Sequence, residues 1–346
     1  MAFALLCLWS FPCGAENYVL VGQMGSEVRY ELEQRVTRSP GTQKLVLSFV
    51  VPPSFESPTY RQKIHGFDLV FSPQPKDKKR SQDNRGNQII VATWKPTPPE
   101  ITARISFKAL NQTRLQQLQT GTPFPLGKVP SDVSPYLSPT KQVQSDDPRI
   151  RKLAKELTQD VTTHFDAVQR ILTWIEDNLR YVTPPAKYDA LYGLEARKGN
   201  CQNFSHLSAA LMRAVSIPVR IVNGVTLNKP FNVSRKGGVL TFKMGQGRHS
   251  WIEVWFRDLG WVPFDPQQTE LFVSNRYIRI EIGIDNNETI NDGLLRWSQI
   301  SGSKGKPRLQ ESINAAFDSD QVKLSGSRQQ YGPRNLLLVP PVQATF

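Results

Sequence analysis

The sequence predicts an α+β protein in which an all-β, sandwich-like domain precedes a domain of mixed helices and strands. Residues 16–118 contain short segments rich in Val, Ile, Phe and Tyr, and Pro or Gly residues separate these segments. From residue 141 onwards, apolar residues first recur at helical spacing, and strand-like segments follow. A stretch rich in Pro, Gly and Ser at residues 119–140 lies between the two patterns and is typical of a linker.

The N-terminal domain is predicted at residues 16–118 as a β-sandwich of short strands with turns between them. Apolar and polar residues alternate cleanly at 104–108, as expected of a strand with one buried face. His65 is isolated in this region and is assigned to the structure of the domain rather than to a site. The candidate strands are 28–37, 44–51, 64–72, 88–95 and 101–110.

The mixed domain is predicted to begin with helices. Asp146 or Asp147 can cap a helix that carries Pro148 in its first turn. An amphipathic helix is predicted at residues 166–181, where apolar residues fall at helical spacing. A further helix is predicted to begin at Cys201, after a Gly-Asn turn.

Two strands and their flanking segments complete the predicted organisation. Residues 229–247 form a long connection that contains glycines, and we expect a flexible loop that borders a site. Strands are predicted at 249–256 and 261–265. The mixed domain therefore covers residues 141–283. Residues 284–346 are predicted to be a C-terminal extension that is partly disordered, because much of it is polar.

The first fifteen residues resemble a secretory signal peptide, because they are uncharged and a short apolar run precedes small residues. A buried N-terminal strand is the alternative interpretation. Removal of residues 1–15 would take Cys7 and Cys13 with it and leave Cys201 as the only thiol, which can form no intramolecular disulfide. We therefore expect a secreted or periplasmic protein. No later apolar run is long enough to span a bilayer.

The chain is basic, since 43 Lys and Arg residues against 30 Asp and Glu residues give a net charge of +13. A basic protein is attracted to polyanions. Nucleic acid is disfavoured as the partner, because no nucleic-acid motif is present and aromatic residues do not interleave with the charges. For an exported protein, an anionic polymer of the cell envelope is the expected partner. The densest cluster of charge, at residues 76–80, is interpreted as a solvated loop between strands.

Cys201 is the candidate nucleophile. Its place at the first position of a predicted helix, with Asn200 as the N-cap, puts the sulfur beside unpaired N–H groups and the positive end of the helix dipole. These groups favour a thiolate, and the amide of Cys201 could also stabilise an oxyanion. A buried structural cysteine is the alternative, although such residues usually lie within an element rather than at its start.

A cysteine nucleophile needs a base nearby, and the base needs a group that orients it. Of the four histidines, His249 is favoured because it opens a strand and shares a face with Trp251. His206 lies on the same helix as Cys201, off the face of the thiol, and is set aside. Asp265 stands sixteen residues after His249 at the end of the next strand, where its carboxylate could hold the imidazole tautomer.

The register of these two strands tests the geometry. A three-residue loop at 258–260 would pair Arg257 with Trp261, and therefore Glu253 with Asp265. Asp265 would then share a face with His249 but lie four residues away, roughly 13 Å along the strand. On this register, a bulge or a longer loop is needed to bring the carboxylate to the imidazole.

Three groups of residues match one family in order and spacing. They are Gly199-x-Cys201 followed by Leu211-x-Arg213-Ala214 and Ile217-Pro218-x-Arg220; His249-x-Trp251 with Glu253; and Gly260-Trp261 followed by Asp265-Pro266. On these residues, the stretch from 137 to 279 resembles the transglutaminase-like superfamily. The resemblance covers about 140 of the 346 residues, and it does not extend to the β domain that comes first.

The resemblance implies a papain-like core, in which the nucleophile helix packs on an antiparallel sheet that bears His249 and Asp265. It implies that Cys201, His249 and Asp265 form a catalytic triad, and Gln202 and Trp251 are expected beside it together with the N-cap. Calcium-dependent animal members carry a tryptophan after the cysteine, where this chain has Gln202. This departure argues against their calcium dependence and their substrates.

The expected activity is thiol-dependent acyl transfer on protein or peptide amides through a thioester. Water or an amine can resolve the thioester, and we favour hydrolysis, as in a peptidase or deamidase, over cross-linking. A non-catalytic envelope scaffold with an enzyme-like fold is the alternative function. No cofactor is expected, and no metal either, since residues 285–288 are interpreted as a turn rather than as a calcium loop.

Overall fold

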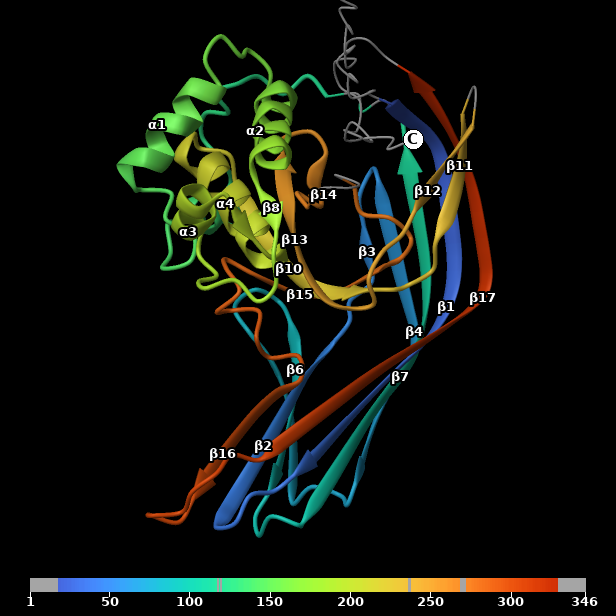
Figure 1. Ribbon diagram of the computed structural model, residues 1–346, viewed down its shortest axis with the longest axis vertical. Coiled ribbons are helices and arrows are strands. Elements are labelled where there is room, and N and C mark those ends of the chain that lie inside the picture. Colours follow the sequence, from blue (N-terminus) through green and yellow to red (C-terminus); the bar gives the residue numbers. More distant parts are fainter. Residues whose placement is uncertain (1–17, 117, 119, 236–237, 268–271, 329–346) are drawn as a thin grey trace, which may run out of the picture.

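The structure, a computed structural model, describes residues 18–328 except 117, 119, 236–237 and 268–271. The predicted signal peptide, residues 1–15, lies outside the described residues. The fold is α+β, as predicted, with long strands on one side and a group of helices on the other (Figure 1). Among the described helices, none is both long and apolar enough to cross a membrane.

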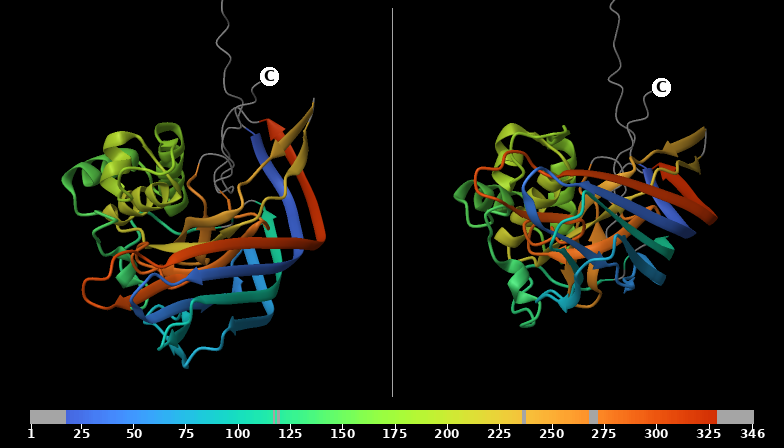
Figure 2. Two further views of the ribbon diagram at one scale, coloured as in Figure 1. Left: turned by 60° about the horizontal axis from the view of Figure 1, so that its bottom comes forward. Right: turned by 90° about the horizontal axis from the view of Figure 1, so that it is seen from below.

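A seven-stranded sheet, which we call the large sheet, forms one layer of the fold. Its strands lie in the order β12-β11-β17-β1-β7-β4-β3. Its longest pair, β1 and β17, is antiparallel from Tyr18 opposite Arg328 to Thr37 opposite Arg308. Figure 2 shows these strands curving across the molecule. The members are β1 (Tyr18–Thr37), β3 (Phe55–Glu56), β4 (Tyr60–Ser72), β7 (Glu100–Leu115), β11 (Phe231–Arg235), β12 (Gly238–Phe242) and β17 (Arg308–Arg328).

A second sheet faces part of the large sheet and completes a sandwich-like arrangement. It contains β16 (Leu294–Gln299), β2 (Thr42–Val51), β6 (Gln88–Trp94) and β5 (Asp77–Gln82), in that order. The core between the sheets contains Leu32 and Val36 from one layer and Leu45, Phe49 and Trp94 from the other. Each of these side chains is almost fully buried, and burial of apolar area is what holds the two layers together.

The charged segment predicted to be a loop at residues 76–80 lies in a strand from residue 77 onwards. Strand β5 pairs with β6 at the edge of the second sheet, and all its side chains are exposed. Pairing on one side satisfies half of its backbone, while its lysines and arginine face solvent. Charged residues on an edge strand discourage pairing with other chains, which explains how so polar a segment forms a strand.

The helices and a four-stranded antiparallel sheet form the remaining part. The sheet has the order β14-β13-β10-β15, and α4 packs against β13 and β10. The core around α4 includes the fully buried Phe204, Leu207 and Leu211. The elements are η1 (Ser134–Leu137), α1 (Pro148–Leu157), α2 (His164–Asn178), β8 (Arg180–Tyr181), α3 (Ala190–Ala196), β9 (Lys198–Gly199), α4 (Cys201–Ala214), β10 (Val219–Thr226), β13 (Gly247–Phe256), β14 (Gly260–Phe264) and β15 (Tyr277–Gly283).

The large sheet takes strands from segments that the sequence assigned to separate parts. Within 229–247, predicted to be a flexible loop, β11 and β12 form a hairpin, and β11 pairs in parallel with β17 at Ser234 and Ser325. The prediction of partial disorder for 284–346 is wrong at 308–328, which is β17. Along β17, partly buried Ile313 and Phe317 alternate with exposed residues. Only one face of this strand meets a core, so its composition remains polar.

Candidate active site

The start of α4 is fixed by a reciprocal cap. The Asn200 side chain accepts a hydrogen bond from the amide of Gln202 at 3.1 Å, and the Asn203 side chain accepts one from the amide of Asn200 at 3.1 Å. The predicted N-cap is therefore confirmed. Because the cap uses the amides after Cys201, the amide of Cys201 itself remains available at the helix terminus.

Gly199 has a packing role next to this cap. A Cβ atom at Gly199 would lie only 2.3 Å from the Cβ atom of Asn203. Asn203 cannot give way easily, because its amide group donates to the carbonyl oxygens of Lys187 and Asp189. Any side chain at Gly199 therefore displaces the residue that holds the start of the helix.

We expect Gly199→Ala to lower the free energy of unfolding by about 1–3 kcal/mol, the usual cost of overpacking. The substitution should also slow alkylation of Cys201, because the helix start moves with the cap. Gly193→Ala in α3 is a matched control, since its added Cβ atom meets Leu207 at 3.5 Å, an ordinary contact. Thermal unfolding and iodoacetamide labelling measure the two effects. Equal stability of both variants would contradict the packing role.

His249 and Asp265 are in direct contact. The Nε2 atom of His249 lies 2.7 Å from Oδ2 of Asp265, and both side chains are at least 90% buried. Asp265 has two further partners: the amide of Gln267 donates to Oδ1 at 3.0 Å, and the Tyr277 hydroxyl donates to Oδ2 at 2.6 Å. These bonds fix the carboxylate, and the carboxylate fixes the imidazole ring.

The other ring nitrogen of His249 remains for the thiol. The Cys201 side chain interacts with the His249 ring and is one of the causes that raise its pKa. Because Nε2 is occupied by Asp265, Nδ1 is the ring nitrogen left for the sulfur. Burial disfavours the charged ring, but the Asp265 carboxylate and the Cys201 sulfur outweigh burial and raise the pKa of His249 to about 10. The imidazole is therefore protonated on both ring nitrogens at neutral pH.

The register that brings Asp265 to His249 differs from the predicted one by two residues. Strands β13 and β14 pair Phe256 with Gly260 and Ile252 with Phe264. Continued by one residue, this register places Asp265 opposite Trp251. The three-residue turn begins one position earlier than predicted, and Gly260 adopts a φ of +70° that suits glycine. Asp265 and His249 are thus diagonal neighbours on one face, within side-chain reach. No bulge is needed.

A model of the transglutaminase-like superfamily matches residues 151–266, a range that contains Cys201, His249 and Asp265. The chain therefore contains a transglutaminase-like domain. Two curated relatives match this region: the uncharacterized protein YebA of Bacillus subtilis, 34% identical over 126 residues, and the uncharacterized protein ML0607 of Mycobacterium leprae, 30% identical over 122 residues. Each match covers 34% of this chain, but only 17% and 40% of these relatives.

One solved structure resembles nearly the whole chain. It is a crystal structure of a protein from Cytophaga hutchinsonii described as a candidate cysteine protease, with a TM-score of 0.63 and 20% sequence identity. The likeness covers 90% of this chain and all of that one. At this identity the likeness concerns the fold, and it includes the sheets outside the transglutaminase-like domain.

Two aromatic rings pack against the imidazole of His249, which lies in the transglutaminase-like domain. The Trp251 ring stacks on His249 with centroids 6.0 Å apart, and the Tyr277 ring meets His249 edge-on at 5.7 Å. Trp251 is fully buried, on the same strand face as His249 as predicted. Tyr181 is 44% exposed and lies near Cys201. Partial burial and the Cys201 sulfur both raise the pKa of the Tyr181 phenol.

The large sheet braces the strand that carries Tyr277. The Tyr60 hydroxyl and the Asn111 amide both donate to the carbonyl oxygen of Tyr277, at 2.8 and 2.9 Å. Nearby, the Thr113 hydroxyl donates to the carbonyl oxygen of Val273 at 3.1 Å. These side chains are buried, so the bonds are shielded from water. The β domain thus contributes to the position of the residue that holds Asp265.

Sequence reasoning did not find Tyr277 or Tyr181. Tyr277 is the first residue of β15, whereas its partner Asp265 directly follows β14, and the sequence carries no signal for that contact. The position of Tyr181 depends on the parallel pairing of β8 with β9 just before Cys201. Both pairings are tertiary, and a periodic pattern in one segment cannot reveal them.

The other histidines lie away from Cys201 and its partners. His206 is fully buried and ties two loops together, since its Nδ1 lies 2.6 Å from the carbonyl oxygen of Tyr188 and its Nε2 accepts the amide of Asn286. Burial lowers the pKa of His206 to about 4, so the ring is neutral. His164 is buried against Phe256, and His65 is exposed on β4. The turn at residues 285–288 is confirmed, with the Asp285 carboxylate accepting backbone amides.

Proposed function

We propose that this protein is a cysteine enzyme that cleaves amide bonds in proteins or peptides, with Cys201, His249 and Asp265 as its catalytic residues. One observation carries the proposal: a thiol at a capped helix start interacts with an imidazole whose other ring nitrogen is bonded to a buried carboxylate. A structural cysteine has no need of such a chain of partners. The transglutaminase-like fold supports the same conclusion.

In the first half of the reaction, the Cys201 thiolate adds to the amide carbonyl carbon and forms a tetrahedral oxyanion. The amide of Cys201, left free by the cap, is placed to donate to this oxyanion. The oxyanion then collapses, the C–N bond breaks, and the proton on Nδ1 of His249 passes to the departing nitrogen. Ammonia or an amine leaves, and a thioester on Cys201 remains.

In the second half, neutral His249 takes a proton from water, and the resulting hydroxide attacks the thioester carbonyl. The C–S bond breaks, the carboxylic acid leaves, and the thiolate–imidazolium pair is restored. An amine in place of water would give a cross-link. We propose hydrolysis as the main outcome, in a secreted or periplasmic setting.

Thiol reactivity is the first test. In a Cys7→Ser, Cys13→Ser background Cys201 is the only thiol of the chain. We expect iodoacetamide to label Cys201 at pH 7 faster than it labels free cysteine, since the thiolate is the reactive form. Labelling no faster than free cysteine removes the support for an enzyme and favours a scaffold with this fold.

The fate of the thioester is the second test. Casein is incubated with the protein and dansyl-cadaverine, and both ammonia release and dansyl incorporation are measured. Release of ammonia or new amino termini without incorporation supports hydrolysis, while stoichiometric incorporation identifies a transferase. Cys201→Ala is the control and should show neither ammonia release nor dansyl incorporation.

The raised pKa of His249 predicts the alkaline limb of the rate profile. With its pKa near 10, His249 keeps the proton needed by the leaving group up to that pH, and deprotonation above it slows amide cleavage. We expect single-turnover ammonia release from casein to fall only as the pH approaches 10. Asp265→Asn should move this fall to lower pH, because the carboxylate no longer stabilises the imidazolium. A fall centred near 6.5, the ordinary value for histidine, would contradict the described ion pair.

A further inference from the structure

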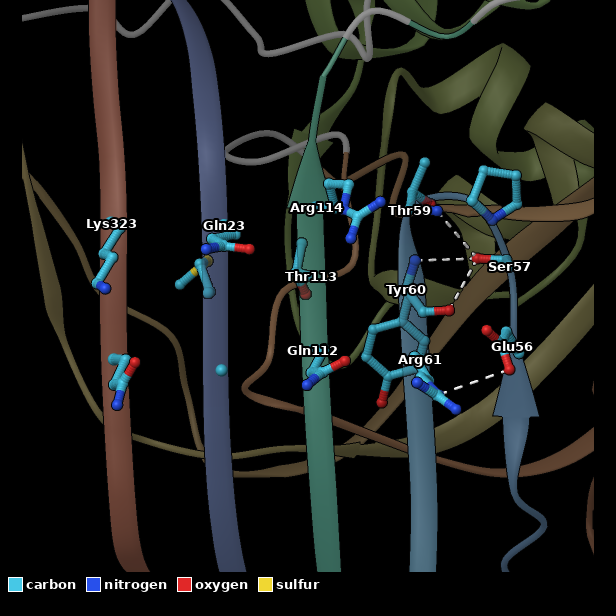
Figure 3. A pocket seen from close by; sticks show the side chains of 14 residues that line it. Gln23, Glu56, Ser57, Thr59, Tyr60, Arg61, Gln112, Thr113, Arg114 and Lys323 are labelled. Carbon is cyan, nitrogen blue, oxygen red and sulfur yellow. Dashed lines mark hydrogen bonds and ion pairs between the residues drawn. The ribbon is translucent and has the colours of Figure 1, made fainter.

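The outer face of the large sheet carries a polar hollow of about 460 Å³, and Cys201, His249 and Asp265 are not among the residues that line it. Strand alternation gives the direction of its side chains: Met24 and Thr113 are buried on the inner face, whereas their neighbours Gln23 and Arg114 are exposed. Figure 3 views the hollow face-on, with strands β17, β1, β7, β4 and β3 side by side and the helices behind them. The hollow therefore opens on the side of the sheet opposite the transglutaminase-like domain.

The strand register arranges the lining in two parallel rows. In one row, Lys323 lies opposite Gln23, and Gln23 lies opposite Arg114. The second row runs through Gln321, Gly25, Gln112, Arg61 and Glu56. Each row crosses the strands at right angles, so a ligand that lies along a row meets one side chain about every 5 Å.

The charge of the hollow is positive. Arg61, Arg114 and Lys323 line it, and Glu56 is the only carboxylate among the lining residues. Arg61 lies 3.5 Å from Glu56. Among the residues that the structure describes, no carboxylate pairs with Arg114 or Lys323, and both side chains are exposed. Two strand spacings, roughly 10 Å, separate these two cations.

Gly25 forms the floor of the hollow. A Cβ atom placed there would meet no atom within 4 Å, so the missing side chain leaves open space within the second row. Three glutamines, Gln23, Gln112 and Gln321, surround this gap. Their amide groups both donate and accept hydrogen bonds, which suits the oxygen atoms and backbone of a polar chain.

We infer that this hollow is a binding site for a linear polyanion whose carboxylate or phosphate groups pair with Lys323 and Arg114. Charges repeated along a chain fit cations held in a row, and the gap at Gly25 admits the backbone of the ligand. The net charge of +13 draws such a polymer to the protein, and the hollow gives it a place to bind. The site would hold a polymer on the side opposite the catalytic residues, so binding and cleavage can be tested separately.

The experiment measures binding of fluorescein-labelled poly-L-glutamate and of polyphosphate by anisotropy, at about 50 mM salt where exposed ion pairs are weakly screened. The two polymers distinguish a carboxylate ligand from a phosphate ligand. The test variant is Arg114→Gln, Lys323→Gln. Its control is Lys78→Gln, Lys79→Gln on the exposed edge strand β5, which removes the same charge from the second sheet. Gly25→Met fills the floor without any change in charge.

We expect the hollow variant to weaken binding of at least one polymer roughly ten-fold, as for loss of two exposed ion pairs, and the β5 control to change it less than two-fold. Gly25→Met should weaken binding several-fold while thermal unfolding and Cys201 labelling stay unchanged. Equal losses in the hollow and β5 variants would show general charge attraction and overturn the site. Unchanged binding in Gly25→Met, or no binding of either polymer to the wild type, would also overturn it.

Discussion

Replacing Cys201 by alanine is expected to lower the rate of amide cleavage by roughly 10⁴-fold or more, to the background of the assay. Alanine has no atom that can form the thioester, so the acyl-enzyme disappears rather than forming slowly. Ammonia or peptide release from casein measures the loss. Mass spectrometry of acid-quenched wild-type protein should detect a covalent adduct on Cys201 that the variant lacks.

The fold should survive this substitution, because Cys201 is partly exposed and the cap of α4 rests on its neighbours. Unchanged thermal unfolding would therefore assign the loss to chemistry. Cys201→Ser keeps the size of the side chain, but its hydroxyl has no stable anion at neutral pH, so it should be almost as inactive. Cleavage within ten-fold of the wild type in Cys201→Ala would rule out the proposed mechanism.

Local patterns were enough to predict the helix that begins at Cys201 and the residue that caps it. The cap at Asn200 and the helix from Cys201 follow from residues adjacent in sequence, and the structure has both. The predicted strand at 249–256 likewise lies within β13. Such features depend on caps, turns and periodicity within a few residues, which is the range over which a sequence can be interpreted directly.

Features that depend on pairing between distant strands were not predictable. The turn after Phe256 could begin at either of two adjacent residues, and moving it by one residue shifts the opposite strand by two. Strand β17 was hidden because its composition is polar and its partner β1 lies almost 300 residues earlier. The contact of Tyr60 with Tyr277 spans 217 residues, so the link between the β domain and Asp265 appears only in three dimensions.

Asp265→Asn is expected to slow amide cleavage by roughly 10²- to 10⁴-fold while leaving the fold intact. Asparagine has almost the same shape and can keep the hydrogen bond from Tyr277, but it has no charge to balance a buried imidazolium. If its NH₂ group takes the place of Oδ2 instead, the bond from Tyr277 is lost and the NH₂ group donates to Nε2 of His249. The proton of the neutral ring then lies on Nδ1, so the ring cannot accept the thiol proton there. The rate of single-turnover ammonia release from casein measures the effect.

Tyr277→Phe separates the charge of Asp265 from its position. This variant keeps the carboxylate and the aromatic contact with His249 but removes the 2.6 Å hydrogen bond to Oδ2. Because the carboxylate keeps its charge but is held less firmly, we expect Tyr277→Phe to lower the rate of amide cleavage roughly ten-fold. This rate lies between those of the wild type and of Asp265→Asn. The alkaline limb should stay close to its wild-type position in Tyr277→Phe and move to lower pH in Asp265→Asn. If both variants shift the limb equally, orientation rather than charge is the role of Asp265, and the electrostatic account of the raised His249 pKa is wrong.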